Sequence, residues 1–342
     1  MAAKIVVTGG TGYIGSHTVV ELQQAGYDVL IVDDLSNSSA DVVDSIEEIT
    51  GIRPGFEQLN LADTAKTDDF FSRHTDIKAI IHFAASKAVG ESVQIPLHYY
   101  RNNLVSLMNI LDCQLKYGID NIVFSSSCTV YGQPDVLPVT EKTPRKDAES
   151  PYGNTKRVNE DILSDTVRAY PQLKAIALRY FNPIGAHPSG LIGELPLGVP
   201  QNLVPFITQA AAGLRGALSV FGDDYDTPDG SAIRDYINVV DLAKAHVIAI
   251  ARLLDAKNKA RYEVFNLGTG NGYSVLEIVK GFEKATGVKL NYKIVARRAG
   301  DIEKIWADTT FANGELGWNA QIGLEETLAS AWKWEKRIRG IQ

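Results

Sequence analysis

The chain has 342 residues, of which 45% are hydrophobic and 22% are charged, a composition typical of a globular protein with a substantial core. Its formal net charge of −7 argues against a nucleic-acid partner, which requires a basic surface, and no run of about 18 apolar residues predicts a membrane span. The two cysteines, Cys113 and Cys128, and six scattered histidines predict neither a disulfide scaffold nor a catalytic metal, so we expect a reducing, cytoplasmic setting.

The first predicted elements lie in residues 4–38, KIVVTGGTGYIGSHTVVELQQAGYDVLIVDDLSNS, which have the pattern of strand, glycine turn, helix and strand. The turn matches two spacings of the dinucleotide-binding fingerprint, through Gly9, Gly10, Gly12 and Gly15. Glycines there permit a tight turn and close approach of a pyrophosphate, and the following helix N-terminus attracts the anion.

Asp33 ends the second predicted strand. A carboxylate at that point accepts hydrogen bonds from both ribose hydroxyls and repels a 2′-phosphate, so NAD is favoured over NADP. The alternative is a solvated loop carboxylate without a ligand.

Strand-like runs continue at residues 55–61, 77–84, 121–126 and 173–181, with helical patterns between them. This alternation predicts an α/β fold with a doubly wound parallel (Rossmann) sheet. Ligands of such sheets bind at the carboxyl ends of the strands, so Phe83, Ala84, Ala85 and Lys87 should border the cofactor. Asn60 lies at the end of the third predicted strand and either meets adenine or is a plain loop residue.

SPYGNTKR, residues 150–157, places a tyrosine four residues before a lysine at a helix start. Ser150 suits the N-cap and Pro151 the first helical position. An ammonium near the Tyr152 phenol favours the phenolate, and lowering a tyrosine pKa from about 10 to about 7 requires roughly 4 kcal/mol. Tyr152 and Lys156 would then form a general base; the alternative is an ordinary amphipathic helix.

Ser127 closes the fifth predicted strand in FSSSCTVYG, residues 124–132. A serine, a tyrosine and a lysine beside a nicotinamide are the parts of a hydride-transfer site. A covalent serine nucleophile is the competing interpretation, but the chain has no G-x-S-x-G elbow around Ser127.

Beyond about residue 180 the alternation weakens and glycine and proline become frequent, as in NPIGAHPSGLIGELPLGVPQN. We therefore expect a NAD-binding domain at residues 1–180 and a smaller, mainly substrate-binding α/β region at 181–342, with some chain crossing back to the sheet. Arg234 and Arg298 are candidate clamps for a diphosphate; ordinary surface ion pairing is the alternative.

Together, VTGGTGYIGSH, FSSSCTVYG, SPYGNTK, LRYFNPIGAHPSG, RDYINVVDLA, YEVFNLGTG and WAD resemble the extended short-chain dehydrogenase/reductase family, and within it the UDP-galactose 4-epimerases. The resemblance runs from residue 6 to about 308. It implies that Tyr152 takes the proton of the sugar 4-hydroxyl while the C4 hydride passes to NAD. The 4-keto sugar then turns and receives the hydride on its other face, so UDP-galactose and UDP-glucose interconvert.

The resemblance also implies the site residues. Catalysis falls to Tyr152, Lys156 and Ser127. NAD is contacted by Gly9, Gly12, Tyr13, Ile14, Gly15, Asp33, Asn37, Ser38, Asn60, Leu61, Phe83, Ala84, Lys87, Asn102, Tyr152, Lys156 and Phe181. The UDP-hexose is held by Ser127, Tyr152, Asn182, Asn202, Leu203, Phe221, Arg234, Arg298, Asp301 and Ile305.

Three positions depart from the family pattern: Asn60 replaces an aspartate, Ala85-Ser86 replaces Gly-Leu, and Ile305 replaces a tyrosine common in bacterial relatives. The departure at Ile305 leaves open that the substrate is an N-acetylated UDP-hexose, or that plain and N-acetylated UDP-hexoses are both substrates. A nucleotide-sugar 4,6-dehydratase is one alternative function, but it would need carboxylates where Cys128 and Thr129 stand. A non-catalytic NAD sensor is the other, but such proteins often lack the Tyr-Lys pair. The apolar helix near residues 99–117 and the helix from Ser150 form an intersubunit bundle in the family, so a homodimer is expected.

Overall fold

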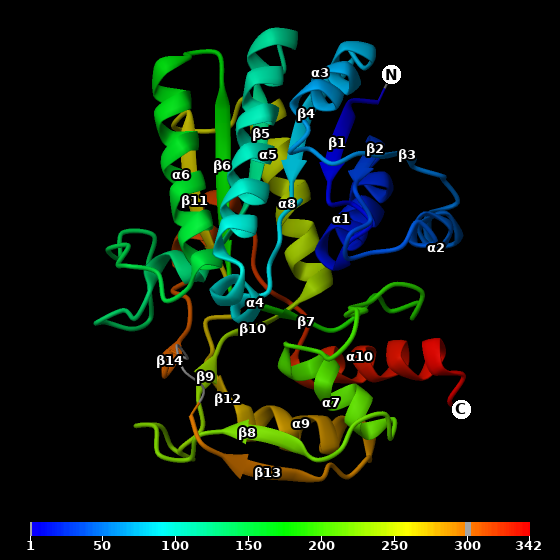
Figure 1. The fold of residues 1–342 in the computed structure, drawn as a ribbon, viewed down its shortest axis with the longest axis vertical. Coiled ribbons are helices and arrows are strands. Elements are labelled where there is room, and N and C mark those ends of the chain that lie inside the picture. Colours follow the sequence, from blue (N-terminus) through cyan, green and yellow to red (C-terminus); the bar gives the residue numbers. More distant parts are fainter. Residues whose placement is uncertain (1, 298–301) are drawn as a thin grey trace.

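Seven parallel strands form the central sheet of the computed structural model, which describes residues 2–297 and 302–342 (Figure 1). Their order across the sheet is β11-β6-β5-β4-β1-β2-β3. The strands are β1 (Lys4–Thr8), β2 (Asp28–Asp33), β3 (Gly55–Gln58), β4 (Ile77–His82), β5 (Asn121–Ser127), β6 (Lys174–Tyr180) and β11 (Tyr262–Leu267). The doubly wound parallel sheet predicted from the alternating pattern is confirmed.

Helices cover both faces of this sheet because its strands are apolar on both sides. Ile5 and Val7 of β1 pack into one core, with α1, α2 and α8, whereas Val6 packs into the other, with α3, α5 and α6. These helices are α1 (Tyr13–Gln24), α2 (Val42–Thr50), α3 (Thr64–Arg73), α5 (Pro96–Tyr117), α6 (Pro151–Ala169) and α8 (Val239–Leu254); the short α4 (Val89–Gln94) precedes α5.

The second half of the chain builds a smaller region below the carboxyl ends of the strands (Figure 1). It has its own core, in which Ile207, Phe282 and Leu328 are fully buried. Its elements are β7 (Asn182–Ile184), α7 (Leu203–Ala211), β8 (Leu218–Phe221), β9 (Ile233–Arg234), β10 (Tyr236–Asn238), β12 (Tyr273–Ser274), α9 (Val275–Thr286), β13 (Tyr292–Val295), β14 (Lys304–Ile305), a π-turn (Ala312–Leu316) and α10 (Leu324–Arg339).

Strand β11 returns from the second half to the central sheet and pairs in parallel with β6. Helix α8 likewise packs against α1 on the first half of the fold. The predicted third strand was too long, since β3 ends at Gln58 and Asn60 lies in the following turn.

Helix α6 begins where the sequence predicts. The Ser150 side chain accepts a hydrogen bond from the Gly153 amide at 3.1 Å, and Pro151 occupies the first turn. A short 3-10 turn, Cys128–Tyr131, follows β5 and is capped by Ser127, whose hydroxyl accepts from the Thr129 amide at 3.2 Å. These two caps set where α6 and the turn after β5 begin.

Candidate active site

The glycine turn after β1 forms a cradle at the carboxyl edge of the sheet. A Cβ on Gly15 would overlap the Gly9 carbonyl oxygen, and one on Gly9, whose φ is +70°, would lie 2.8 Å from the Ala84 amide nitrogen. The backbone of this turn therefore packs directly on the start of α1 and on the segment after β4. The first amides of an α-helix have no acceptor within the helix, so the α1 N-terminus beside this turn fits the pyrophosphate of a dinucleotide.

Asp33 lies at the carboxyl end of β2, beside this cradle, and is 8% exposed. Its carboxylate accepts hydrogen bonds from the Thr11 amide at 3.2 Å, the Leu35 amide at 3.0 Å and the Ser38 hydroxyl at 3.2 Å. Three donors hold this negative charge at the edge of the predicted adenosine site, which fits ribose hydroxyls and disfavours a 2′-phosphate.

The predicted catalytic residues converge from α6 and β5. Lys156 is 3% exposed, and its ammonium donates to the Ser125 carbonyl at 2.7 Å and lies 5.9 Å from the centroid of the Tyr152 ring. Ser127 is 7% exposed at the end of the same strand. The structure thus brings Tyr152, Lys156 and Ser127 together, as the sequence predicts.

The electrostatics of this group differ from the prediction. Burial raises the pKa of Tyr152, with Tyr180 and Cys128 adding to the rise and the neighbouring Ser127 hydroxyl opposing it. Burial also lowers the pKa of Lys156 to about 7, against the charge of Glu160. The sequence pattern indicated that Lys156 lowers the pKa of Tyr152, whereas burial dominates the pKa of the phenol in this structure.

Several predicted cofactor residues surround the same edge. Phe83 packs on His246 with ring centroids 4.6 Å apart, and Phe181 is 3% exposed after β6. Leu61 is 4% exposed, whereas Asn60 and Asn37 are exposed. Asn60 accepts a hydrogen bond from the Ala62 amide at 2.9 Å, as a turn residue does.

Lys87 and Tyr13 connect the two halves of the fold. Lys87 lies 3.3 Å from the Glu194 carboxylate and 5.9 Å from the centroid of the Tyr13 ring, whose hydroxyl donates to the Gly185 carbonyl at 2.7 Å. Asn202 donates to the same Glu194 carboxylate at 2.7 Å. A predicted cofactor residue and a predicted substrate residue thus share one carboxylate, which the sequence did not indicate.

The remaining predicted substrate residues lie on the second half. Asn202 precedes α7 at the N-cap position and Leu203 begins the helix, Asn182 begins β7, and Phe221 ends β8 with 41% exposure. Arg234 of β9 pairs with Ile305 of β14, and Ile305, 1% exposed, packs in one cluster with Phe181 and Cys128. Arg298 and Asp301 lie outside the described residues.

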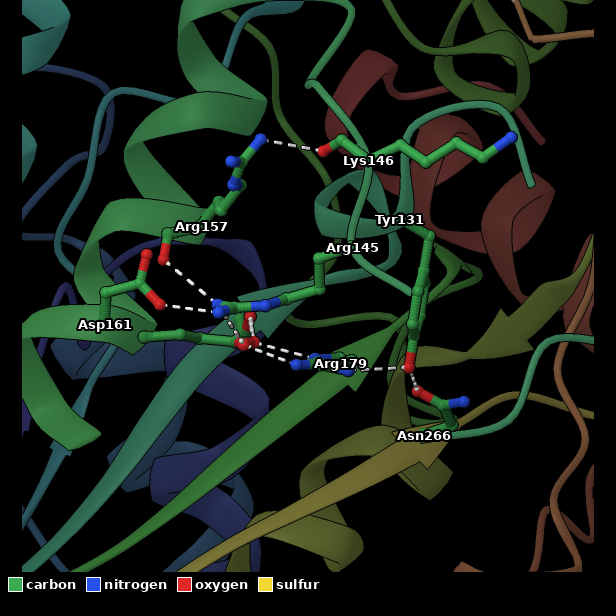
Figure 2. Close-up of polar contacts among 9 residues, drawn as sticks. Tyr131, Arg145, Lys146, Arg157, Asp161, Arg179 and Asn266 are labelled. Carbon is green, nitrogen blue, oxygen red and sulfur yellow. Dashed lines mark hydrogen bonds and ion pairs between the residues drawn. The ribbon is translucent and has the colours of Figure 1, made fainter. Parts of the chain in front are cut away.

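Other residues near the site were not predicted from the sequence. Asn103 of α5 accepts a hydrogen bond from the Ser86 amide at 2.8 Å, beside the predicted Asn102, which donates to the Ser86 hydroxyl at 3.2 Å. A buried network of Arg179, Tyr131 and Asn266 lies beside α6 (Figure 2). Its members come from β6, β11 and the 3-10 turn after β5, which are far apart in the sequence, so no local pattern marks them.

Within residues 2–297 and 302–342, no cluster of three or more histidine, cysteine or acidic side chains could hold a metal ion. Among the same residues, no helix is both long enough and apolar enough to cross a membrane.

The sequence pattern of the NAD dependent epimerase/dehydratase family matches residues 5–268. A UDP-glucose 4-epimerase of Bacillus subtilis (strain 168) is 51% identical over 331 residues, 97% of this chain and 96% of that protein. One of Mus musculus is 48% identical over 340 residues, 98% of this chain and 97% of that protein.

Solved structures resemble the whole fold. A UDP-glucose 4-epimerase from Bifidobacterium longum in complex with NAD+ and UDP has a TM-score of 0.94 and 45% identity, covering 99% of this chain and 100% of that one. Another, from Stenotrophomonas maltophila with bound NAD and formylated UDP-arabinopyranose, has a TM-score of 0.95 and 47% identity, with the same coverage.

Proposed function

The chain belongs to the NAD dependent epimerase/dehydratase family, and from that membership we infer that Tyr152, Lys156 and Ser127 carry out its reaction. The protein interconverts UDP-galactose and UDP-glucose, with NAD as cofactor, through transient oxidation at the sugar C4. The N-acetylated alternative is not favoured, since the relatives 47–51% identical to the chain carry the plain UDP-glucose name.

The proposed division of labour follows from the geometry of the site. NAD, when bound, supplies a reversible hydride acceptor for the sugar C4. Tyr152 takes the proton of the 4-hydroxyl and later returns it, and Ser127 orients that oxygen. Lys156, next to both the phenol ring and the end of β5, holds the compensating positive charge. Because the protein alone disfavours the phenolate, we propose that the filled site completes the activation of Tyr152.

The observation that supports this proposal is the meeting of the Tyr152–Lys156 pair with the glycine cradle at one edge of the sheet. The experiment is incubation of the purified protein with UDP-galactose and no added NAD. Formation of UDP-glucose is expected, because retained cofactor is regenerated in each cycle. A 4-keto-6-deoxy product would instead identify a dehydratase, and no turnover would identify a sensor.

A prediction about the cofactor rests on Asp33. Denaturation of the purified protein should release NAD(H), because the carboxylate held by Thr11, Leu35 and Ser38 would repel a 2′-phosphate. Chromatography of the released nucleotides is the measurement. A preparation that yields mostly NADP(H) would contradict the role given to Asp33.

We propose that residues 1–180 bind NAD and residues 181–342 mainly bind the UDP-hexose. Asp33 and the glycine cradle support the first assignment. Asn202 and Arg234 lie in the second half of the chain and support the other.

A cytoplasmic location is also proposed, because Cys113 and Cys128 are both free and buried.

The proposed homodimer makes a further prediction. On α5, Leu97 is 65% exposed and Met108 is 42% exposed, and they lie on the same side of the helix, which packs beside α6. We expect a dimer by light scattering at micromolar concentration and a monomer after Leu97→Lys. Ile52→Lys, at an apolar residue 53% exposed just after α2, should leave the dimer intact. A monomeric wild type would refute the assignment.

A further inference from the structure

Glu160 lies one helical turn after Lys156 on α6, and its side chain is 1% exposed. Its Oε1 accepts hydrogen bonds from the Ser126 hydroxyl at 2.5 Å and from Arg179 Nε at 2.8 Å. Its Oε2 accepts from Arg179 Nη2 at 2.5 Å and from Arg145 Nη1 at 3.4 Å. One buried carboxylate therefore joins α6 to β5 and β6.

The residue that Glu160 holds on β5 stands between two residues of the active site. Ser125 supplies the carbonyl that accepts from Lys156, and Ser127 ends the strand. Ser126, between them, is fully buried and donates to Glu160. Glu160 thus fixes the end of β5 against the helix that carries Tyr152.

The same network reaches the turn after β5 and the far edge of the sheet. Arg179 Nη1 donates to the Tyr131 hydroxyl at 2.9 Å, and that hydroxyl donates to the Asn266 side chain at 2.6 Å (Figure 2). Tyr131 belongs to the 3-10 turn that Ser127 caps, and Asn266 belongs to β11. The position of the Ser127 turn therefore depends on Arg179, which Glu160 holds.

We propose that Glu160 is a positioning residue of the epimerase reaction, which fixes α6 against the end of β5 and places one negative charge a helical turn from Lys156. This inference rests on the roles proposed above for Tyr152, Lys156 and Ser127. Glu160 itself touches neither the sugar nor NAD in this proposal; it acts through Lys156 and Ser126.

The charge of Glu160 is distinctive among the groups that face the pair. The titratable groups that act on Tyr152 or Lys156 are Glu160 of α6, His82 of β4, Tyr180 of β6, Cys128 after β5 and Tyr99 of α5, with Arg179 and Arg145 bound to Glu160 itself. Burial lowers the pKa of His82 to about 3 and raises those of Cys128 and Tyr180 to about 12, so these groups are neutral at pH 7. Of this set, Glu160 supplies the negative charge that favours protonated Lys156.

The direct test is Glu160→Gln, which keeps the size of the side chain and an acceptor for Ser126. The Tyr152–Lys156 pair must lose one proton to become active, and a nearby carboxylate favours the fully protonated, cationic pair. Removing that charge should shift the acid limb of the kcat profile downward by about one pH unit. It should also lower the plateau about tenfold, because the lysine cation that accompanies the phenolate loses its partner charge.

Glu263→Gln is the matched control, because Glu263 makes a comparably buried two-point pair with Arg252, at 2.7 and 2.9 Å, between β11 and α8. Both variants should lose thermal stability, since each leaves a buried arginine without the negative charge of its partner. Only Glu160→Gln should move the pH profile. A profile displaced equally in both variants, or in neither, would overturn the proposal.

Two milder variants keep the test valid if Glu160→Gln does not fold. Arg145→Met removes a partly exposed cation from Glu160, so the acid limb should move upward, opposite to the effect of Glu160→Gln. Ser126→Ala removes the link to β5 but no charge, so kcat should fall several-fold with the limb unmoved. The positioning role would be refuted if the acid limb of the kcat profile stayed unchanged in Arg145→Met and kcat stayed unchanged in Ser126→Ala. If Tyr152→Phe remained active, the proposed function itself would fail instead.

Discussion

Tyr152→Phe is expected to lower kcat by about a thousandfold or more while the protein still folds and retains NAD. The phenol oxygen is the group that accepts the proton of the sugar 4-hydroxyl, and the phenyl ring cannot replace it. The ring itself keeps its packing at the start of α6, and no cofactor-cradle residue changes. The measurement is the rate of UDP-galactose conversion, together with the NAD content of the purified variant.

Tyr262→Phe is the control for this substitution. Tyr262 has a buried hydroxyl with no hydrogen-bond partner among the described residues, so its loss should leave kcat unchanged and should not reduce stability. Turnover of Tyr152→Phe within threefold of the wild-type rate would end the assignment of Tyr152 as the base. A parallel loss of NAD would point to a binding role instead.

Gly15→Ala should produce the second large effect, which is loss of bound NAD and therefore of activity. The added methyl group would overlap the Gly9 carbonyl and lie 2.8 Å from Gly10 Cα, and both are backbone atoms that cannot rotate away. The N-terminus of α1 must then move off the turn, which separates its amides from the pyrophosphate. The NAD released per chain on denaturation should fall from near one to near zero.

Gly216→Ala is the corresponding control, because a Cβ at Gly216 would meet no atom within 4 Å. That variant should keep its NAD and its activity. A Gly15→Ala protein with full cofactor content would show that the turn does not bind the pyrophosphate through close backbone contact.

The parts of the site that the sequence predicted are those specified by neighbouring residues. Each of these features depends on residues only a few positions apart. They are the glycines of a turn, the acidic residue at a strand end, and Ser150-Pro151 before a helix. The structure confirms the capped start of α6 and the meeting of Tyr152 with Lys156 and the end of β5. The family resemblance added cofactor and substrate residues, which remain predictions.

Other features depend on contacts across the fold and could not be predicted in this way. The direction of the Tyr152 pKa follows from how deeply several elements bury it, and a pair of residues four apart contains no such information. The network of Glu160 likewise joins residues separated by up to 135 positions, as between Tyr131 and Asn266. Its polar side chains come together in one network only when the strands have paired.

The return of β11 to the central sheet has a consequence for synthesis on the ribosome. When residues 1–180 have emerged, β6 is an open edge whose amides and carbonyls still await β11, and the α1 face still lacks α8. The nascent NAD-binding half therefore exposes a template for strand addition until residue 267 leaves the exit tunnel. During that interval a chaperone that shields open strand edges would protect the chain from aggregation.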